Sequence, residues 1–581
     1  LIVLAALGCK KDEVPSNQEV ITDLPNEPGG NPLVPGEAMY PFPSDFFLAD
    51  DPSTRTGRSI AIPALALPGD LVPETFAGID GWPRAPIILA HFETGIDLSS
   101  LPDPRDEAAS IADSSPAFLV REGTFERVPV LIELDAVAVT ASRQALIMRP
   151  QRALDPNTGY VVILRDLLQA ADGSGPLETS DAFRALRDGI ATDSDEVESM
   201  RDDFVLVTKA ISETGLRPDE VVLAWSFHTR SRDQVVTPLL TMVDQVMDAA
   251  LGQYQVTTDE FVDDNREIRG TIEAPNFIGP EGTIVVDEND VAVQQGTRDV
   301  PFLVTIPVTV DETRPTVLYG HGFFSHMDEP TWSSLQGLIQ PGRVTMVSTN
   351  FMGFNEDDQF ESFQILADLN RTDEISAMQM QSESHFVVLA RMVKEQMAGT
   401  LMENRGNGEF PVMDADQVLY MGISNGGTQG LTIMSVAPNI DRGILVVPGG
   451  GLIHFLQRAS QWLTMGPLLA VQFGDDLDFQ VGGSLMQVHL DPWDSINFVD
   501  HLVSPRFEGR EPVTLQIHQA VEDAQRIGPG GAQRHGQVLV VGRRDGALDH
   551  RPVRAVELQV QISVEVNEGQ IRDQATAGLD R

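Results

Sequence analysis

The feature that most constrains how this chain can fold is a glycine-rich turn at residues 422–427, with the sequence G-I-S-N-G-G. It follows an apolar segment at 417–421 and precedes a segment at 427–436 with apolar residues at helical spacing. A serine on such a sharp strand-to-helix turn takes a strained backbone conformation, and its neighbours must be small. The turn lifts the hydroxyl of Ser424 clear of the sheet, at the positive end of the helix. It therefore predicts a nucleophilic serine. The small residues that support the turn are Gly422, Gly426 and Gly427.

A second glycine-rich turn, Gly320-His321-Gly322, follows a short apolar segment at 316–319. Acyl transfer needs main-chain N–H donors directed at the oxygen that becomes negative in the transition state. A turn of this kind can supply such a donor. By itself it is equally consistent with an ordinary turn that ends a strand, and it gains weight from the serine turn.

Beyond residue 315, apolar strand-like segments alternate with segments of helical spacing. The expected strands are 316–319, 343–349, 417–421, 443–448 and 512–517, and the expected helices are 382–397 and 427–436. This alternation predicts a mostly parallel sheet covered on both faces.

The first part of the chain has a different pattern. Short apolar segments separated by turn residues, such as 87–90, 117–120 and 160–164, predict a β-rich, sandwich-like N-terminal domain at 39–180. Residues 181–262 carry apolar residues at helical spacing around one strand, and we expect a mainly helical segment there.

With these features in view, residues 315–525 resemble an α/β-hydrolase, and the whole chain resembles the large bacterial lipoprotein hydrolases related to virulence-factor lipases. The N-terminal marks are the segments 40–45 (YPFPSD), 149–154 (RPQRAL) and 157–160 (NTGY). The resemblance implies an α/β-hydrolase domain at 263–525 that cleaves lipid or other esters at the cell surface. It also implies an oxyanion hole formed by the N–H groups of Phe323 and Asn425.

The resemblance also implies a chain order of serine, then acid, then histidine. The acid should follow the late strand at 513–518, which assigns Asp523, with Glu522 as the alternative. The histidine is His550, because His535 follows the acid too closely to leave room for a helix. In such a triad the carboxylate orients the imidazole, which removes the proton from Ser424.

The similarity stops after residue 525. Residues 526–581 form an atypical tail in which Arg and Gly are frequent, against the acidic trend of the rest of the chain. Two interpretations stay open: a shift of the reading frame near residue 525, or a divergent but genuine C-terminus. A Val-Pro continuation and a later histidine in another frame of the gene would decide between them.

The N-terminal segment predicts export. Residues 1–8 are apolar or small, Cys9 follows, and a polar stretch rich in Pro, Asn and Gly covers 10–38 as a flexible linker. The apolar stretch is too short to span a bilayer, which needs about 20 residues. It resembles the end of a bacterial lipoprotein signal, of which 1–9 is the remnant. We expect secretion across the inner membrane and a lipid anchor on Cys9 in the cell envelope, at the outer membrane.

The charge excludes one class of partner. The chain has 40 basic and 86 acidic residues, a net charge of −46, whereas nucleic-acid binding needs a basic surface. No metal or organic cofactor is required, and the expected partner is a small-molecule or lipid ester. Residues 351–371 and 462–467 are either core or the wall of an acyl pocket. The two functional hypotheses are an envelope-anchored serine ester hydrolase and a catalytically inactive hydrolase-fold scaffold protein.

Overall fold

The computed structural model describes residues 20–22, 24, 39–103, 106–406, 408–459, 461–508, 510, 512–522 and 534–541 of the 581-residue chain. The predictions for Cys9, Asp523 and His550 therefore lie outside the described residues. Glu522 and His535 belong to strands whose backbone alone is described there. Ser424 and the oxyanion-loop residues lie inside the described part.

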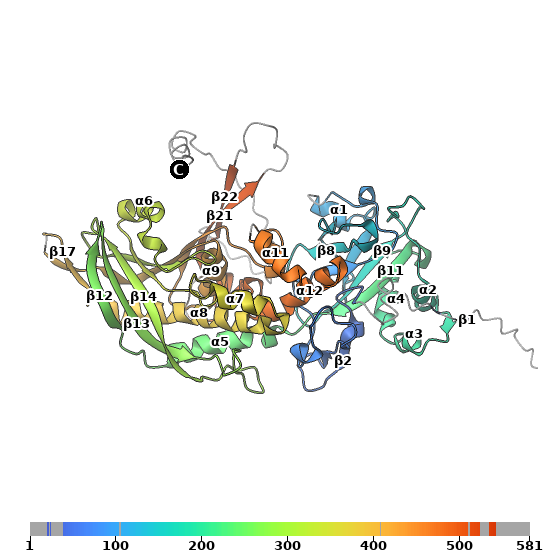
Figure 1. The fold of residues 1–581 in the computed structure, drawn as a ribbon, viewed down its shortest axis with the longest axis horizontal. Helices are drawn as coiled ribbons and strands as arrows, with labels where there is room; N and C mark the ends of the chain where they lie inside the picture. Colours follow the sequence, from blue (N-terminus) through green and yellow to red (C-terminus); the bar gives the residue numbers. More distant parts are fainter. Residues whose placement is uncertain are drawn as a thin grey trace, which may run out of the picture.

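The two larger sheets of the N-terminal unit are antiparallel (Figure 1). One has the order β11-β9-β5-β6 and the other the order β4-β8-β7. The strands are β4 (Ile88–Ala90), β5 (Ala117–Arg121), β6 (Arg127–Val128), β7 (Val130–Leu134), β8 (Leu146–Pro150), β9 (Gly159–Arg165) and β11 (Val221–His228). Strand β9 is buried along its whole length, which explains its continuous apolar sequence.

The segment at 181–262 is divided between the two parts of the molecule. Strand β11 is buried over most of its length and pairs with β9, so it completes the N-terminal sheet. Helix α5 (Arg232–Asp248) instead packs against α8 (Thr372–Met392) of the second unit. The smaller helices α2 (Asp181–Asp188), α3 (Asp195–Ser199) and α4 (Phe204–Glu213) lie beside the N-terminal sheets (Figure 1).

The second unit is built on a nine-stranded sheet with the order β12-β13-β14-β16-β15-β19-β20-β21-β22. Its strands are β12 (Gln255–Val262), β13 (Asn265–Asn276), β14 (Gly296–Pro307), β15 (Arg314–Gly320), β16 (Thr345–Ser348), β19 (Met413–Ile423), β20 (Arg442–Val446), β21 (Thr514–Glu522) and β22 (Arg534–Val541). The five strands from β16 to β21 are parallel, but both margins are antiparallel. The sheet is thus mixed rather than mostly parallel. At one margin the turn between β12 and β13 is too short for a parallel crossover, so this pair is antiparallel.

Helices cover both faces of the parallel part (Figure 1). Helix α6 (Ser333–Gly342) joins β15 to β16, and its Leu335 and Ile339 pack on Val317 and Tyr319. Leu318, between those two in sequence, joins the main core on the other face, as the two-residue period of a strand requires. Helices α8 and α9 (Asn425–Val436) contact each other and lie with that main core.

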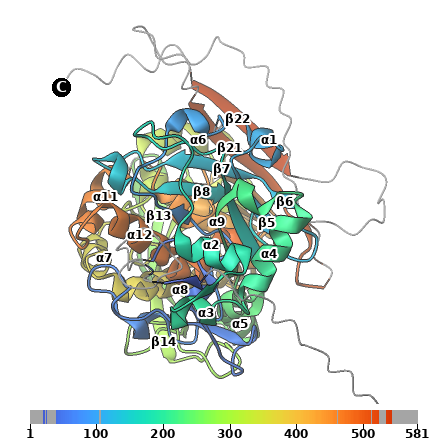
Figure 2. The same cartoon turned by 90° about the vertical axis from the view of Figure 1, so that its right-hand side faces the viewer.

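A long insertion separates β20 from β21. It carries α10 (Leu452–Leu456), α11 (Trp462–Ala470), α12 (Asp476–Leu490) and α13 (Asp500–Val503). Helices α11 and α12 lie between the sheet and the N-terminal unit in Figure 1, and on the left side of the molecule in Figure 2. No helix in the described part of the chain is long and apolar enough to cross a bilayer.

Candidate active site

The strand order brings the two glycine-rich turns together. From β15 the chain goes through α6 to β16 on one side, and the next strand, β19, pairs with β15 on its other side. Ligands bind outside the carboxyl ends of the strands at such a switch point. Gly320 at the end of β15 lies opposite Gly422 near the end of β19. The predicted nucleophile and the His-Gly turn therefore share one edge of the sheet.

Ser424 has the strained conformation that the sequence predicts, with φ 56° and ψ −115°. It lies between β19 and α9, and it is partly exposed. Its N–H donates to the carbonyl of Val446 at 2.9 Å, and its carbonyl accepts from the N–H of Thr428 at 3.0 Å. These bonds fix the main chain on both sides of the strained residue, so the hydroxyl has a defined position.

Close backbone contacts explain the glycines. A Cβ atom added at Gly426 would lie 2.0 Å from the carbonyl oxygen of Gly320, and one at Gly422 would lie 2.1 Å from the carbonyl oxygen of Gly426. A Cβ at Gly427 would lie 2.7 Å from the oxygen of Val446. A side chain at Gly426 would therefore force the serine turn away from the His-Gly turn, and one at Gly422 or Gly427 would distort the serine turn itself or push it from β20.

The two turns are also joined by a hydrogen bond. The N–H of Gly426 donates to the carbonyl of His321 at 2.9 Å. On either side of this bond, the N–H groups of Phe323 and Asn425 donate to no acceptor among the described residues. Two unused N–H groups beside a serine hydroxyl form a suitable site for a negative oxygen.

His321 supports the loop and is not the base. It is fully buried, and burial lowers its pKa to about 4, so its imidazole is neutral at pH 7. The Nδ1–H donates to the carbonyl of Gly322 at 2.7 Å, and Nε2 accepts from the N–H of Phe351 at 2.9 Å. Both ring nitrogens are therefore used to hold the loop.

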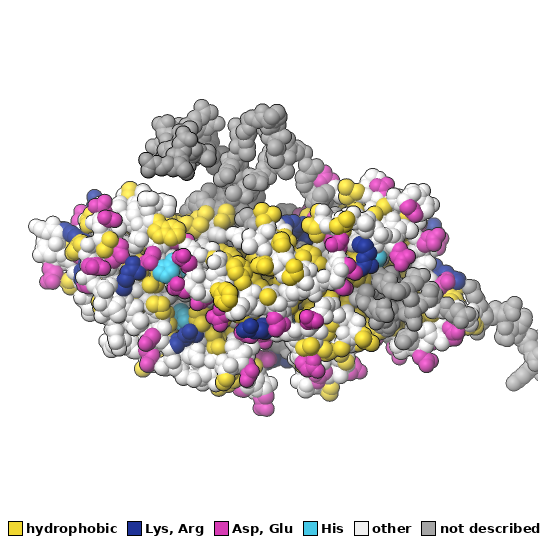
Figure 3. Space-filling view, viewed as in Figure 1, with side chains coloured by type: hydrophobic (Ala, Val, Ile, Leu, Met, Phe, Trp, Pro, Cys, Tyr) yellow, Lys and Arg dark blue, Asp and Glu magenta, His cyan; other side chains and the backbone are white. Residues whose placement is uncertain are grey.

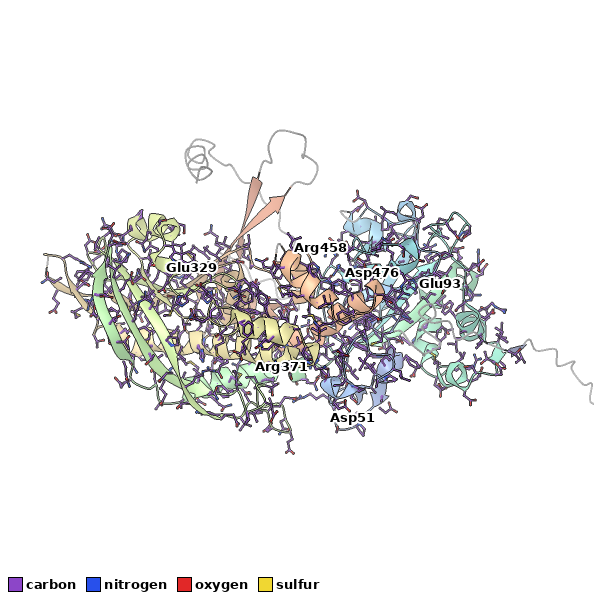
Figure 4. The ribbon with its side chains drawn as sticks, in the orientation of Figure 1. Asp51, Glu93, Glu329, Arg371, Arg458 and Asp476 are labelled. Atoms are coloured by element: carbon purple, nitrogen blue, oxygen red, sulfur yellow. The ribbon has the colours of Figure 1, made fainter. Side chains whose placement is uncertain are left out.

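Sequence reasoning missed a second support of this loop, the carboxylate of Glu329. Its two oxygens accept from the N–H of Gly322 at 3.1 Å and from the hydroxyl of Tyr319 at 2.5 Å. Burial, followed by the nearby Glu329 charge, raises the pKa of Tyr319, which keeps its hydroxyl a donor. Glu329, labelled in Figure 4, begins a short 3-10 helix at Glu329–Thr331, and no motif marks it in the sequence.

Ser424 lies in the wall of an apolar pocket. The pocket is lined by Phe323, Phe354, Leu366, Ile375, Ser424, Asn425, Thr428, Leu452, Phe455, Leu456, Gln461, Met465, Met486, Leu490 and Trp493. Members of both segments that were expected to be either core or pocket wall are present: Phe354 and Leu366 from one, Met465 from the other. Figure 3 shows hydrophobic side chains gathered over the middle of this face, where α7 (Gln359–Leu366), α11 and α12 lie in Figure 1.

The predicted acid Asp523 and the predicted base His550 lie outside the described residues. Strand β21 ends at Glu522, directly before the predicted Asp523. Ser424 makes no side-chain cap bond to α9, and among the described side chains none makes a hydrogen bond with its Oγ. His454, on pocket-lining helix α10, is bound elsewhere, with Nε2 3.0 Å from the Ala85 carbonyl and Nδ1 3.2 Å from Arg149. Asp523 and His550 stay predictions.

The central parallel strands, the strained serine turn and the adjoining His-Gly loop together define an α/β-hydrolase-like fold. No protein-family model matches the chain, and a comparison with curated proteins found no match.

Among solved structures, acetyl xylan esterase 1 from Thermoanaerobacterium sp. JW/SL YS485 is 15% identical with a TM-score of 0.30, over 46% of this chain and 76% of that one. A cold-adapted esterase from an Arctic intertidal metagenomic library is 13% identical with a TM-score of 0.23, over 37% and 73%. An S-formylglutathione hydrolase from Agrobacterium tumefaciens is 12% identical with a TM-score of 0.22, over 36% and 71%. These TM-scores are all below 0.5, so no activity is inferred from these structures.

Proposed function

We propose that the protein is a serine ester hydrolase for substrates with an apolar acyl group. The observation that carries this proposal is the arrangement around Ser424: a strained turn, two unused N–H groups and an apolar pocket meet at one hydroxyl. A site that serves only as scaffold has no need for a nucleophile held at a backbone angle that costs free energy.

In this mechanism Ser424 Oγ attacks the ester carbonyl while a histidine takes its proton. The N–H groups of Phe323 and Asn425 stabilise the negative oxygen of the tetrahedral intermediate. The histidine then protonates the leaving alcohol, and water hydrolyses the acyl-enzyme by the same steps in reverse order. The resemblance gives the chain order of serine, acid and histidine, and on that order we assign the orienting carboxylate to Asp523 and the base to His550 rather than His535.

The lining of the pocket favours substrates with an apolar acyl chain. Most of its side chains are aliphatic, aromatic or Met, and described ionisable side chains are absent from the lining. An alkyl chain of the substrate can therefore be buried there without leaving a charge desolvated.

Labelling with a fluorophosphonate probe, which reacts with an activated serine, tests the proposal. Purified full-length protein should be labelled at a single site, and Ser424→Ala should abolish the label. His550→Ala and His535→Ala, compared side by side, identify the base, and Asp523→Asn tests its partner. Folded wild-type protein that takes no label would refute the enzyme and support the inactive scaffold.

We also propose that Cys9 carries a lipid anchor that holds the enzyme in the cell envelope. The support is the apolar segment directly before Cys9 and the polar linker after it. Expression with an alkyne fatty acid should label the wild type and not Cys9→Ser. Labelling that persists in Cys9→Ser would disprove this anchor.

A further inference from the structure

The pocket is built mainly by the insertion between β20 and β21. Eight of its fifteen lining residues belong to this insertion, including Leu452 and Phe455 from α10 and Met486 and Leu490 from α12. The sheet supplies the nucleophile, and the insertion supplies most of the surface that an acyl chain would touch. Whatever holds α10 and α12 in place therefore sets the shape of the pocket.

Helix α10 has two opposite sets of contacts. Leu452, Phe455 and Leu456 line the pocket. His454 and the following Gln457 instead contact the N-terminal unit: His454 Nε2–H donates to the carbonyl of Ala85 at 3.0 Å. A helix of five residues has little stability of its own, so these contacts decide where it lies.

Arg149, at the end of β8 in the N-terminal unit, makes the central contact with α10. Its guanidinium donates to Gln457 Oε1 at 2.7 Å and to His454 Nδ1 at 3.2 Å. Burial, followed by the Arg149 charge, lowers the pKa of His454 to about 3, so the ring is neutral and Nδ1 can accept. A third bond, from Arg149 Nε to Glu133 Oε1 at 2.8 Å, fixes the guanidinium in turn. Only 5% of Arg149 is exposed, which makes these bonds costly to lose.

The carboxylate of Glu133 extends this contact to the chain after α10. It accepts from Arg458 at 2.7 and 2.9 Å. Arg458 and Asp476, both labelled in Figure 4, lie where the insertion meets the N-terminal unit, and Asp476 accepts from the N–H of Val139 at 3.0 Å.

Helix α12 is held in the same way. The Arg230 guanidinium donates to the carbonyl of Val488 at 3.0 Å, between the pocket residues Met486 and Leu490. The hydroxyl of Tyr40 donates to the carbonyl of Leu477 at 3.0 Å, near the start of the helix. The Arg84 guanidinium donates to Asn497 Oδ1 at 3.3 Å, and Asn497 follows shortly after Trp493, the last pocket residue in the sequence.

We propose that the N-terminal unit determines which acyl chains the enzyme accepts, and that Arg149 is a positioning residue that fixes α10 as a wall of the pocket. Arg149 contacts no reacting atom; it acts through Gln457 and His454. The selectivity part of this inference rests on the proposed ester hydrolase function, whereas the positioning of α10 does not.

The test compares Arg149→Met with a matched control, Arg165→Met, in the full-length protein. Arg165 is also buried, with 8% exposed, and it donates to the carbonyls of Asp113 and Ser115 at 2.7 and 2.8 Å, all within the N-terminal unit. Two quantities are measured: hydrogen exchange of the amides at 452–458, with those of α5 as internal reference, and kcat/KM for nitrophenyl octanoate relative to nitrophenyl acetate.

Arg149→Met should speed exchange at 452–458 and lower the octanoate-to-acetate ratio, each by about tenfold, as expected for loss of a buried hydrogen bond to a charged group. Arg165→Met should change neither, although it lowers the melting temperature. Arg149→Lys, which restores one donor, should recover part of both effects.

Unchanged exchange at 452–458 in Arg149→Met would overturn the positioning role, and an equal change in Arg165→Met would show a general loss of stability instead. A normal octanoate-to-acetate ratio in Arg149→Met would overturn the role in selectivity. Hydrogen exchange can be measured without catalysis. A protein without esterase activity would refute the proposed function, and the exchange rates at 452–458 would still show whether Arg149 positions α10.

Discussion

Removal of the Glu329 carboxylate should slow catalysis without weakening substrate binding. Glu329 accepts from the N–H of Gly322 and from the hydroxyl of Tyr319, so it holds the loop whose next residue, Phe323, offers an N–H to the oxyanion. It lines no part of the pocket. In the proposed mechanism its loss therefore affects the transition state more than the bound substrate.

The size of the effect follows from the two hydrogen bonds. Each bond to a charged group is worth about 1.5–3 kcal/mol, and loss of a complete oxyanion donor costs about 10²–10³ in kcat. Glu329→Gln keeps an oxygen for one donor and should lower kcat about tenfold. Glu329→Ala keeps neither bond and should lower kcat about 100-fold, with KM changed by less than about twofold.

Steady-state hydrolysis of nitrophenyl acetate, with the concentration of folded protein taken from thermal unfolding, measures this effect. The matched control is Glu403→Gln. Glu403, on strand β17 (Met402–Asn404), is similarly buried, and its Oε1 accepts from the Arg266 guanidinium at 2.9 Å. Loss of this carboxylate should lower the melting temperature and leave kcat unchanged. Folded Glu329→Ala with wild-type kcat would refute the role given to Glu329.

Three further predictions concern folding and pH. Gly426→Ala should lower the free energy of unfolding by about 1–3 kcal/mol and suppress fluorophosphonate labelling, since its Cβ would meet the Gly320 carbonyl; full labelling would contradict the close contact. Burial raises the pKa of Glu383 in the folded protein, so above about pH 4.3 this side chain ionises first in the unfolded chain. Its contribution to stability therefore falls as pH rises. Glu383→Gln should therefore stabilise the protein more at pH 8 than at pH 5 in thermal unfolding, and equal shifts at both would disprove this. Burial lowers the pKa of four histidines to about 3–4, so their contribution to stability should be complete above about pH 6.5 and fall toward pH 4. In Glu383→Gln, which removes the opposing effect of that carboxylate, a melting temperature that stays flat between about pH 6.5 and pH 4 would contradict this prediction. These histidines are His321, His385, His454 and His489.

The parts of the site that depend on local geometry could be predicted from the sequence. The strain at Ser424 and the need for glycine at Gly422 and Gly426 follow from a strand that turns sharply into a helix, and the structure confirms both. The alternation of strands and helices likewise follows from local periodicity. The antiparallel margins of the sheet were not predicted, because strand pairing depends on the whole chain.

The parts that depend on distant contacts had no signal. Glu329 is an ordinary charged residue until the fold places it beside Gly322. Arg149 lies in a segment that the sequence marks by resemblance, but its partners His454 and Gln457 are about 300 residues away. The pocket, too, is assembled from four separate regions of the chain, so its composition could not be predicted from any single segment.

The buried arginines of the N-terminal unit have a consequence for the order in which the chain can mature. Arg84, Arg149 and Arg230 each have one acceptor nearby in the sequence or in the N-terminal unit, namely Leu154, Glu133 and Gln234. Their other acceptors lie within residues 454–497, which are synthesised more than 200 residues after the last of the three. At about 5–20 residues per second, this leaves an interval of roughly 10–45 s in which the donors that will bind the insertion face water. Docking of the insertion must remove that hydration, so the pocket is completed late, after the strands of the N-terminal unit have been synthesised.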